Sequence, residues 1–151
     1  MLKEEIKSDL NKSVKEKNEV MRSVLRMLLA SILNKEKEKK YKTSKEELTE
    51  EEVLEVILSE VKKRKEAILE YEKGKRQDLV EREKAEIEVL KRYLPEQLSE
   101  KEIKDLVEET IKRIGAKEKK DIGRVMAEIM PKVKGRSDGG TVSKIVKELL
   151  S

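Results

Sequence analysis

The chain has 151 residues, of which 46% are charged, and its 37 Lys and Arg nearly balance its 33 Asp and Glu. It contains no Cys, His, Trp or Phe. These absences exclude disulfides, thiolate and imidazole metal sites, and any nucleophile that depends on a histidine base. We therefore expect a protein without catalytic residues of its own and without a cofactor or bound metal.

Dense and balanced charge with few Gly and Pro is typical of helices whose outer faces carry ion pairs, whereas disorder goes with a large net charge. Apolar residues recur at helical spacing and do not alternate as in strands. The sequence thus predicts an all-α fold with an aliphatic core. No segment approaches the roughly 20 apolar residues of a membrane span, and the first residues lack a secretory apolar region. We expect a cytoplasmic monomer that does not enter membranes.

The first part of the chain, residues 1–94, is expected to form a bundle of long helices. One face of the first helix carries apolar residues at four-residue spacing: Leu2, Ile6, Leu10 and Val14. The second helix, at about residues 19–37, has a similar face: Met21, Val24, Leu25, Leu28 and Ile32. In residues 35–45 only Tyr41 is apolar, which predicts a frayed helix end and a loop.

The third helix is expected to begin at Thr49 and Glu52, which have the spacing of a capping box, and to end near Gly74, which suits a left-handed cap. Its seam alternates three- and four-residue steps, as in helical bundles: Leu54, Ile57, Val61, Arg64, Ile68 and Tyr71. The charged member, Arg64, has three possible roles. It can pair with an internal acid, bind a ligand, or lay its stem on the core and reach water.

A fourth helix follows, with Asp78 and Glu81 as its expected capping pair. Its apolar positions are Val80, Ile87, Leu90 and Leu94. Pro95 closes this helix, because the residue before a proline is biased away from helical geometry. After Pro95 the expected helices are short and frequently interrupted, which marks a second domain at residues 95–151.

Three short helices are predicted in this second domain. The first begins at a capping box formed by Ser99 and Glu102 and stops at Gly115. Asp121 is expected to cap the next helix, and Thr141 to begin the last one. Their apolar residues recur at helical spacing: Ile103, Leu106, Val107, Ile111, Ile114, Ile122, Val125, Met126, Ile129, Met130, Val142, Ile145, Val146, Leu149 and Leu150.

The most distinctive segment is residues 130–140, where Pro131 and Gly135 are expected to break the helical pattern. The resulting loop would carry three cations: Lys132, Lys134 and Arg136. Residues 117–136 hold seven basic residues against three acids. A helix N-terminus beside such cations is a favourable place for a phosphate, although a solvated loop in a Lys-rich protein would show the same composition.

Two strings, Y-L-P-E-Q-L-S at residues 93–99 and M-P-K-V-K-G-R at residues 130–136, resemble the YqeY-like family. Further similarity lies at residues 84–90, 121–126 and 142–147, so the resemblance covers essentially the whole chain. It implies an N-terminal helical bundle at residues 1–94 and a small three-helix C-terminal domain of the GatB/YqeY type at residues 95–151.

This C-terminal domain is similar to the tail domain of the GatB component of the tRNA-dependent amidotransferase (GatCAB), an enzyme that amidates misacylated tRNA and in which this tail helps to hold tRNA. The resemblance therefore implies an accessory protein that binds tRNA or a tRNA–protein complex. It makes three residues the first candidates for phosphate contacts: Lys132, Lys134 and Arg136. The second candidates are Lys119, Lys120, Arg124 and Lys144.

Two other functions remain open at this point. The chain could be an amidotransferase component with carbon–nitrogen ligase activity, using glutamine as amido-N-donor, that acts only together with partner subunits. No ATP-binding motif supports such activity in the chain alone. It could also be a protein-interaction module whose N-terminal helices bind a partner, which the seam residue Arg64 and the basic run at residues 62–65 favour.

Overall fold

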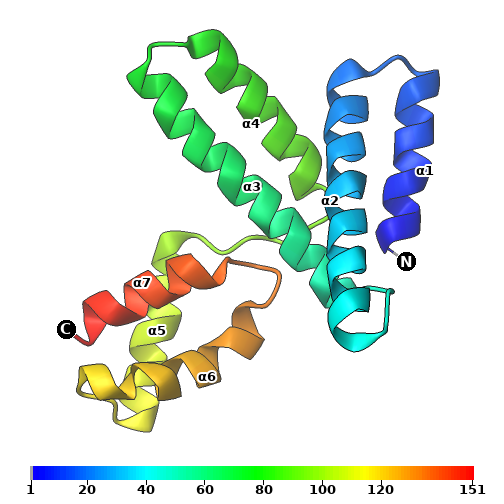
Figure 1. The fold of residues 1–151 in the computed structure, drawn as a ribbon. Helices are drawn as coiled ribbons and strands as arrows, with labels where there is room; N and C mark the ends of the chain where they lie inside the picture. The colour runs from blue at the N-terminus through cyan, green and yellow to red at the C-terminus, as the bar shows by residue number, and fades with distance from the viewer. Residues whose placement is uncertain (1) are drawn as a thin grey trace. The chain divides into compact units, whose positions relative to one another are not determined.

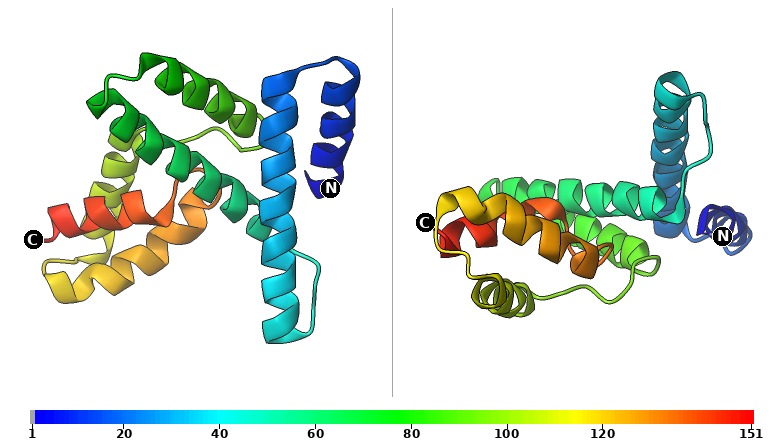
Figure 2. Two further views of the ribbon diagram at one scale, coloured as in Figure 1. Left: turned by 45° about the horizontal axis from the view of Figure 1, so that its top comes forward. Right: turned by 90° about the horizontal axis from the view of Figure 1, so that it is seen from below.

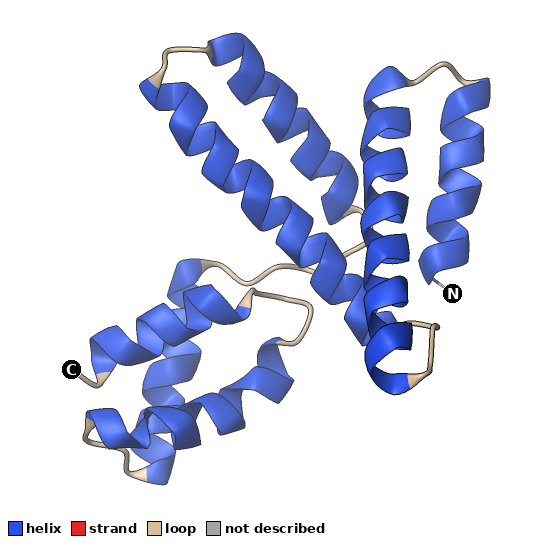
Figure 3. Cartoon of the chain, in the orientation of Figure 1, coloured by secondary structure: helices blue, strands red, loops and turns tan. Residues whose placement is uncertain are grey.

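A computed structural model describes residues 2–151, and these residues form helices joined by turns, with no strand among them (Figure 3). The all-α prediction is confirmed. The helices are α1 Leu2–Lys15, α2 Glu19–Thr43, α3 Glu50–Lys73, α4 Gln77–Lys91, α5 Glu100–Ile114, the 3-10 turn η1 Lys119–Asp121, α6 Ile122–Val133 and α7 Gly139–Leu149. None of the helices in this described part is long and apolar enough to cross a membrane.

The chain divides into two compact units, one ending at Leu94 and the other beginning at Pro95. In the N-terminal unit, α1 with α2 and α3 with α4 form two antiparallel hairpins (Figures 1 and 2). The hairpins share an aliphatic core whose largest fully buried side chains are Ile6, Leu25, Leu28, Ile32, Ile57 and Leu90. Burial of each such side chain contributes about 1.5–3 kcal/mol to folding.

The apolar face of α1 differs from the prediction at its last turn. Val14 is 44% exposed, and Ser13 is fully buried in its place. Ser13 satisfies its hydroxyl by donating to the Leu10 carbonyl oxygen at 2.7 Å. A strict four-residue spacing rotates by about 40° per step on a helix with 3.6 residues per turn, so the fourth member has left the buried face.

Residues 35–45 are helical as far as Thr43, so the predicted loop is wrong there, and Ser44 ends α2 in a left-handed conformation. The helix continues because its polar residues find partners on other elements. Glu36 is buried, and its Oε1 lies 2.6 Å from the Lys3 Nζ of α1. The spacing of apolar residues gives no information about such ion pairs between helices.

A second tie joins α2 to the start of α3. Lys39 Nζ lies 2.6 Å from Glu52 Oε1 and donates to the Glu47 carbonyl oxygen at 2.7 Å. Glu52 also accepts from the Thr49 backbone N–H, and the Thr49 side chain accepts from the Glu52 backbone N–H, so the predicted capping box is confirmed. The hydrogen bonds from Lys39 and from the Thr49 backbone lower the pKa of Glu52 to about 2.

The turn between α3 and α4 departs from both sequence expectations. Gly74 has φ −82°, and the left-handed residue is Lys75, with φ +56°. The side chain of Asp78 does not cap α4. Instead it accepts from Arg76 Nε at 3.2 Å and from Arg76 Nη2 at 3.1 Å. The helix ends at Lys91, four residues before the proline.

Replacing Lys75 by Gly should raise the free energy of unfolding by about 0.5–1 kcal/mol, because glycine adopts a positive φ without a Cβ clash. Gly74→Ala should be tolerated, since a Cβ there would lie 3.7 Å from the Glu70 carbonyl oxygen, an ordinary contact. Urea unfolding measures both changes. A lower free energy of unfolding for Lys75→Gly would contradict the positive φ at Lys75.

In the C-terminal unit, α5, α6 and α7 enclose a separate core, and α6 and α7 run side by side in opposite directions (Figures 1 and 2). Its most deeply buried residues are Ile103, Val107, Val125, Ile129, Val133, Val142 and Val146. The predicted capping box of Ser99 and Glu102 is confirmed, and Gly115 ends α5 with φ +71°.

Candidate nucleic-acid interface

The segment expected to be a loop begins inside a helix. Pro131 lies within α6, so Lys132 is on the last turn of that helix and not on a loop. The reason is that Val125, Ile129 and Val133 are all fully buried at four-residue spacing. Burial of Val133 therefore keeps the chain helical beyond Pro131. The proline has no backbone N–H, so α6 lacks one backbone hydrogen bond at that residue.

The turn after α6 packs against the segment that precedes α5. The Leu98 backbone N–H donates to the Arg136 carbonyl oxygen at 2.9 Å, and Gln97 Nε2 donates to the Gly135 carbonyl oxygen at 2.8 Å. Arg136 Nε in turn donates to the Glu96 carbonyl oxygen at 3.0 Å. The two strings that carry the sequence resemblance therefore contact each other, and Arg136 has a structural role besides its charge.

The N-terminus of α7 already carries a negative charge. The helix begins at Gly139, two residues before the predicted start at Thr141, and its N-cap is Asp138. The Asp138 carboxylate accepts from the Thr141 backbone N–H and from Thr141 Oγ1, both at 2.8 Å. This carboxylate takes the position where a phosphate was expected. Anion binding at this end of α7 thus depends on cationic side chains.

Asp121 also has a different role from the one predicted. Its side chain does not cap α6. It accepts instead from the backbone N–H groups of Lys117 and Glu118, at 3.0 and 3.2 Å. These two hydrogen bonds lower the pKa of Asp121 below its ordinary value. The carboxylate thus orders the turn that presents the neighbouring lysines.

The structure separates the seven predicted contact residues into groups at opposite ends of α6. Lys132, Lys134 and Arg136 lie at its C-terminal end and beyond. The group at its N-terminal end consists of Lys119, Lys120 and Arg124. Twelve residues of helix separate the two ends by about 18 Å. The seventh residue, Lys144, is exposed on α7.

Sequence reasoning missed Lys147. It lines a shallow pocket together with Lys119, because the end of α7 lies beside the start of α6. The other residues of this pocket are Ile122, Glu148 and Ser151. Lys144 and Lys147 are three residues apart on one helix and so are neighbours on its surface. This three-residue spacing is the feature of the sequence from which Lys147 could have been identified as a candidate contact residue.

The predicted cations differ in how far their charge is compensated. Lys120 Nζ lies 3.3 Å from Glu118 Oε2, and Arg124 Nη2 lies 3.7 Å from Asp121 Oδ1. Arg124 Nη2 also donates to the Ile114 carbonyl oxygen at 3.3 Å. Three others form no ion pair within residues 2–151: Lys119, Lys132 and Lys144.

A separate cluster of buried charge surrounds Arg64 in the N-terminal unit. Arg64 is 5% exposed. Its Nη1 donates to Glu60 Oε2 at 2.9 Å, and its Nε donates to Glu86 Oε2 at 3.1 Å and lies 4.0 Å from Glu83 Oε2. Of the three roles that the sequence allowed, pairing with internal acids is the one observed. This cluster joins α3 to α4.

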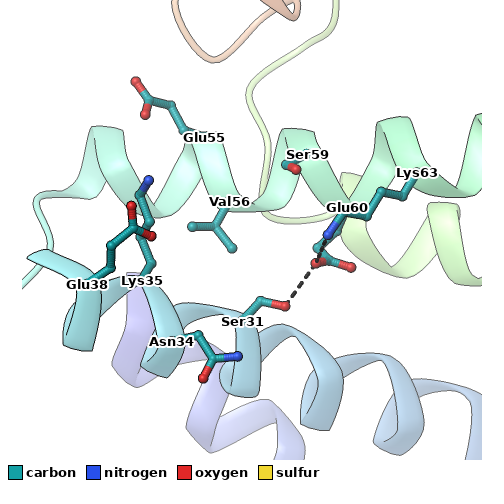
Figure 4. A pocket seen from close by; sticks show the side chains of 9 residues that line it. All are labelled: Ser31, Asn34, Lys35, Glu38, Glu55, Val56, Ser59, Glu60 and Lys63. Carbon is teal, nitrogen blue, oxygen red and sulfur yellow. Dashed lines mark hydrogen bonds and ion pairs between the residues drawn. The ribbon is translucent and has the colours of Figure 1, made fainter.

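Glu60 also lies at a polar cleft of about 430 Å³ between α2 and α3 (Figure 4). Ser31 Oγ donates to Glu60 Oε1 at 2.9 Å, and Lys63 Nζ lies 3.7 Å from the same oxygen. The cleft is lined by Ser31, Asn34, Lys35, Glu38, Glu55, Val56, Ser59, Glu60 and Lys63. Burial raises the pKa of Glu60, but the hydrogen bonds from Arg64 and Ser31 outweigh this and lower it. Such a carboxylate is ionised near neutral pH and is a weak base, so it is poorly suited to general acid–base catalysis.

A family model described as "Yqey-like protein" matches residues 3–150, which covers both helical units and all seven predicted contact residues. No curated protein matches the chain. The family resemblance deduced from the two strings is therefore confirmed.

Proposed function

The chain belongs to the YqeY-like family, and on this premise we propose that it is an accessory protein that binds tRNA, or a tRNA–protein complex, through its C-terminal unit. The observation that carries the proposal is a change of charge along this unit. Residues 96–109 hold six acids and two bases, whereas residues 112–147 hold eleven bases and four acids. Such an asymmetry attracts the phosphate backbone to one part of the unit and repels it from the other.

The uncompensated lysines mark where phosphates bind. Lys119, Lys132 and Lys144 lie in the basic part of the unit, are exposed, and have no acidic partner within residues 2–151. The groups at the two ends of α6 are about 18 Å apart and therefore contact different phosphates of one RNA. The resemblance to the tail domain of the amidotransferase component GatB that the sequence strings imply would also favour RNA as the ligand.

The expected mode of recognition is shape and backbone contact. Residues 95–151 contain no aromatic side chain on which a base could stack. Phosphate contacts position a protein on structured RNA without reading its sequence. The unit should accordingly prefer folded tRNA to an unstructured RNA of the same length.

Binding of tRNA to the full chain between about 50 and 200 mM salt tests the proposal. Affinity should fall linearly on logarithmic axes. Replacing Lys132, Lys134 and Arg136 by Ala should reduce the slope by about 0.7–0.9 for each phosphate that is no longer neutralised. Lys101→Ala with Lys104→Ala, which removes two cations from the acidic part of the unit, is the control and should leave the slope unchanged. No salt-dependent binding at micromolar protein would refute the proposal.

A further inference from the structure

The outward face of α2 carries exposed apolar side chains. Among residues 2–151, six large hydrophobic residues are exposed, and four of them belong to this helix: Val20 (42%), Met27 (52%), Leu33 (46%) and Tyr41 (93%). Six residues at three- and four-residue spacing form what we call the α2 stripe: Arg26, Met27, Ala30, Leu33, Lys37 and Tyr41. All six are exposed, and they lie on one side of the helix.

The charged residues of the stripe itself, Arg26 and Lys37, are both cations. Residues 20–35 contain no acid; further along the helix, Glu36 is buried beside Lys3 and Glu38 pairs with Lys42. Arg22, Arg26 and Lys37 form no ion pair within the described residues. The α2 stripe therefore combines apolar side chains with cations that no acid of the described chain compensates.

The cleft between α2 and α3 borders the stripe. Met27 Sδ lies 3.9 Å from the Arg64 Nη2 of α3, which places Met27 at this border. Figure 4 shows Asn34 and Lys35 on the α2 side of the cleft and Lys63 on the α3 side. Lys63 Nζ lies 3.7 Å from Glu60 Oε1, and Glu38 and Glu55 also line the cleft, so the uncompensated charge belongs to the stripe and not to the cleft.

We propose that the α2 stripe binds an acidic amphipathic helix of a partner protein. The apolar residues of the stripe offer the ridge on which the apolar face of a second helix packs, and the flanking cations are complementary to Asp and Glu beside that face. The stripe is about 23 Å long, which matches about four turns of a partner helix. Phosphates of an RNA would use the cations but not the exposed Met27 and Leu33.

This surface replaces the one that the sequence favoured for a protein partner. The basic run at residues 62–65 presents Lys62 and Lys65, but Arg64 is buried among acids. The α2 stripe lies in the N-terminal unit, whereas the proposed RNA contacts lie in the C-terminal unit. The two proposals therefore stand or fall separately.

The probe is a labelled synthetic peptide of about 20 residues with Leu at three- and four-residue spacing and Glu at the flanking positions. Fluorescence anisotropy measures its affinity for the full chain, and NMR of the chain should show shifts concentrated at the α2 stripe. Arg26→Glu with Lys37→Glu, and separately Met27→Ser with Leu33→Ser, should each weaken binding at least about tenfold. A peptide of the same composition in scrambled order should bind at least about tenfold more weakly.

Lys62→Glu with Lys65→Glu makes the same charge change on α3 and should leave affinity within about twofold. Circular dichroism and thermal unfolding show that each variant is folded, since all these side chains are exposed. Equal binding of the scrambled peptide, or an equal loss in the α3 control, would overturn the proposal. It would also be overturned if Arg26→Glu with Lys37→Glu weakened tRNA binding and left peptide binding intact.

Discussion

Replacing Arg64 by Met is expected to lower the free energy of unfolding by about 3–5 kcal/mol. The buried carboxylates of Glu60 and Glu86 lose their hydrogen-bonded cation and keep only the longer contacts, with Lys63 at 3.7 Å and Arg82 at 3.6 Å. The methionine keeps most of the aliphatic stem, so little of the loss comes from packing. Urea unfolding at neutral pH measures the effect. A loss below about 1 kcal/mol would contradict the network, since exposed ion pairs have values in that range.

The pH dependence of the same variant separates charge from packing. In the wild-type chain the pKa of Glu60 is lowered, so its ionised form stabilises the fold above the ordinary carboxyl pKa, and this contribution is lost as the pH falls through and below that value. Without Arg64, burial favours the neutral acids. The deficit of the variant should therefore shrink from pH 7 to about pH 5.

A combined variant provides the matched control for Arg64→Met. Adding Glu60→Gln and Glu86→Gln removes the two buried carboxylate charges and should recover most of the lost stability. A deficit that is unchanged by both pH and the added substitutions would show that Arg64 acts by packing alone.

The second large effect concerns tRNA. Replacing Lys119, Lys132 and Lys144 together by Glu should weaken tRNA binding at least about 100-fold at about 0.1 M salt, because three phosphate contacts become repulsive. These side chains are exposed, and none has an acidic partner among residues 2–151, so the fold should persist. Electrophoretic mobility shifts or anisotropy measure the affinity.

The control for this triple variant makes the same charge change in the N-terminal unit. Lys7, Lys62 and Lys65 are exposed lysines, and changing all three to Glu gives an identical net charge. Affinity for tRNA should then fall by less than about tenfold, through long-range attraction alone. An equal loss in both variants would show that net charge, and not the C-terminal unit, governs binding.

The sequence predicted correctly those features that depend only on residues close together in the chain. The capping boxes at Thr49 and Ser99 are formed as expected, because Glu52 and Glu102 need only helical geometry to reach the cap. The same spacing failed at Asp78. Arg76, two residues earlier, holds that carboxylate, and spacing alone does not show this competition.

Features that depend on other elements were predicted poorly. Residues 35–45 are mostly helical because Lys3 and Glu52 pair with α2 from other helices, and Lys132 is helical because Val133 is buried in the core. The α2 stripe was hidden for a related reason. Apolar spacing identified the buried face of α2, but it did not show that the further apolar residues Met27 and Leu33 stay exposed.

For the candidate site, the sequence proposed seven contact residues, and the structure arranges them differently from the expectation. The string at residues 130–136 suggested one cationic loop before a helix N-terminus. The structure instead anchors Arg136 on Glu96, fills the helix N-terminus with Asp138, and separates the lysines along α6. These differences arise from a contact between segments about 40 residues apart, from a cap that the chain supplies itself, and from the burial of Val133 in the core.

Sequencing of RNA crosslinked to the protein in cells tests the central claim most directly, when the wild-type chain is compared with the Lys119→Glu, Lys132→Glu, Lys144→Glu variant. Binding of tRNA through the C-terminal unit predicts strong enrichment of tRNA over other RNA with the wild-type chain, and loss of that enrichment with the variant. Absence of tRNA enrichment with the wild-type chain, or equal enrichment with the variant, would contradict it.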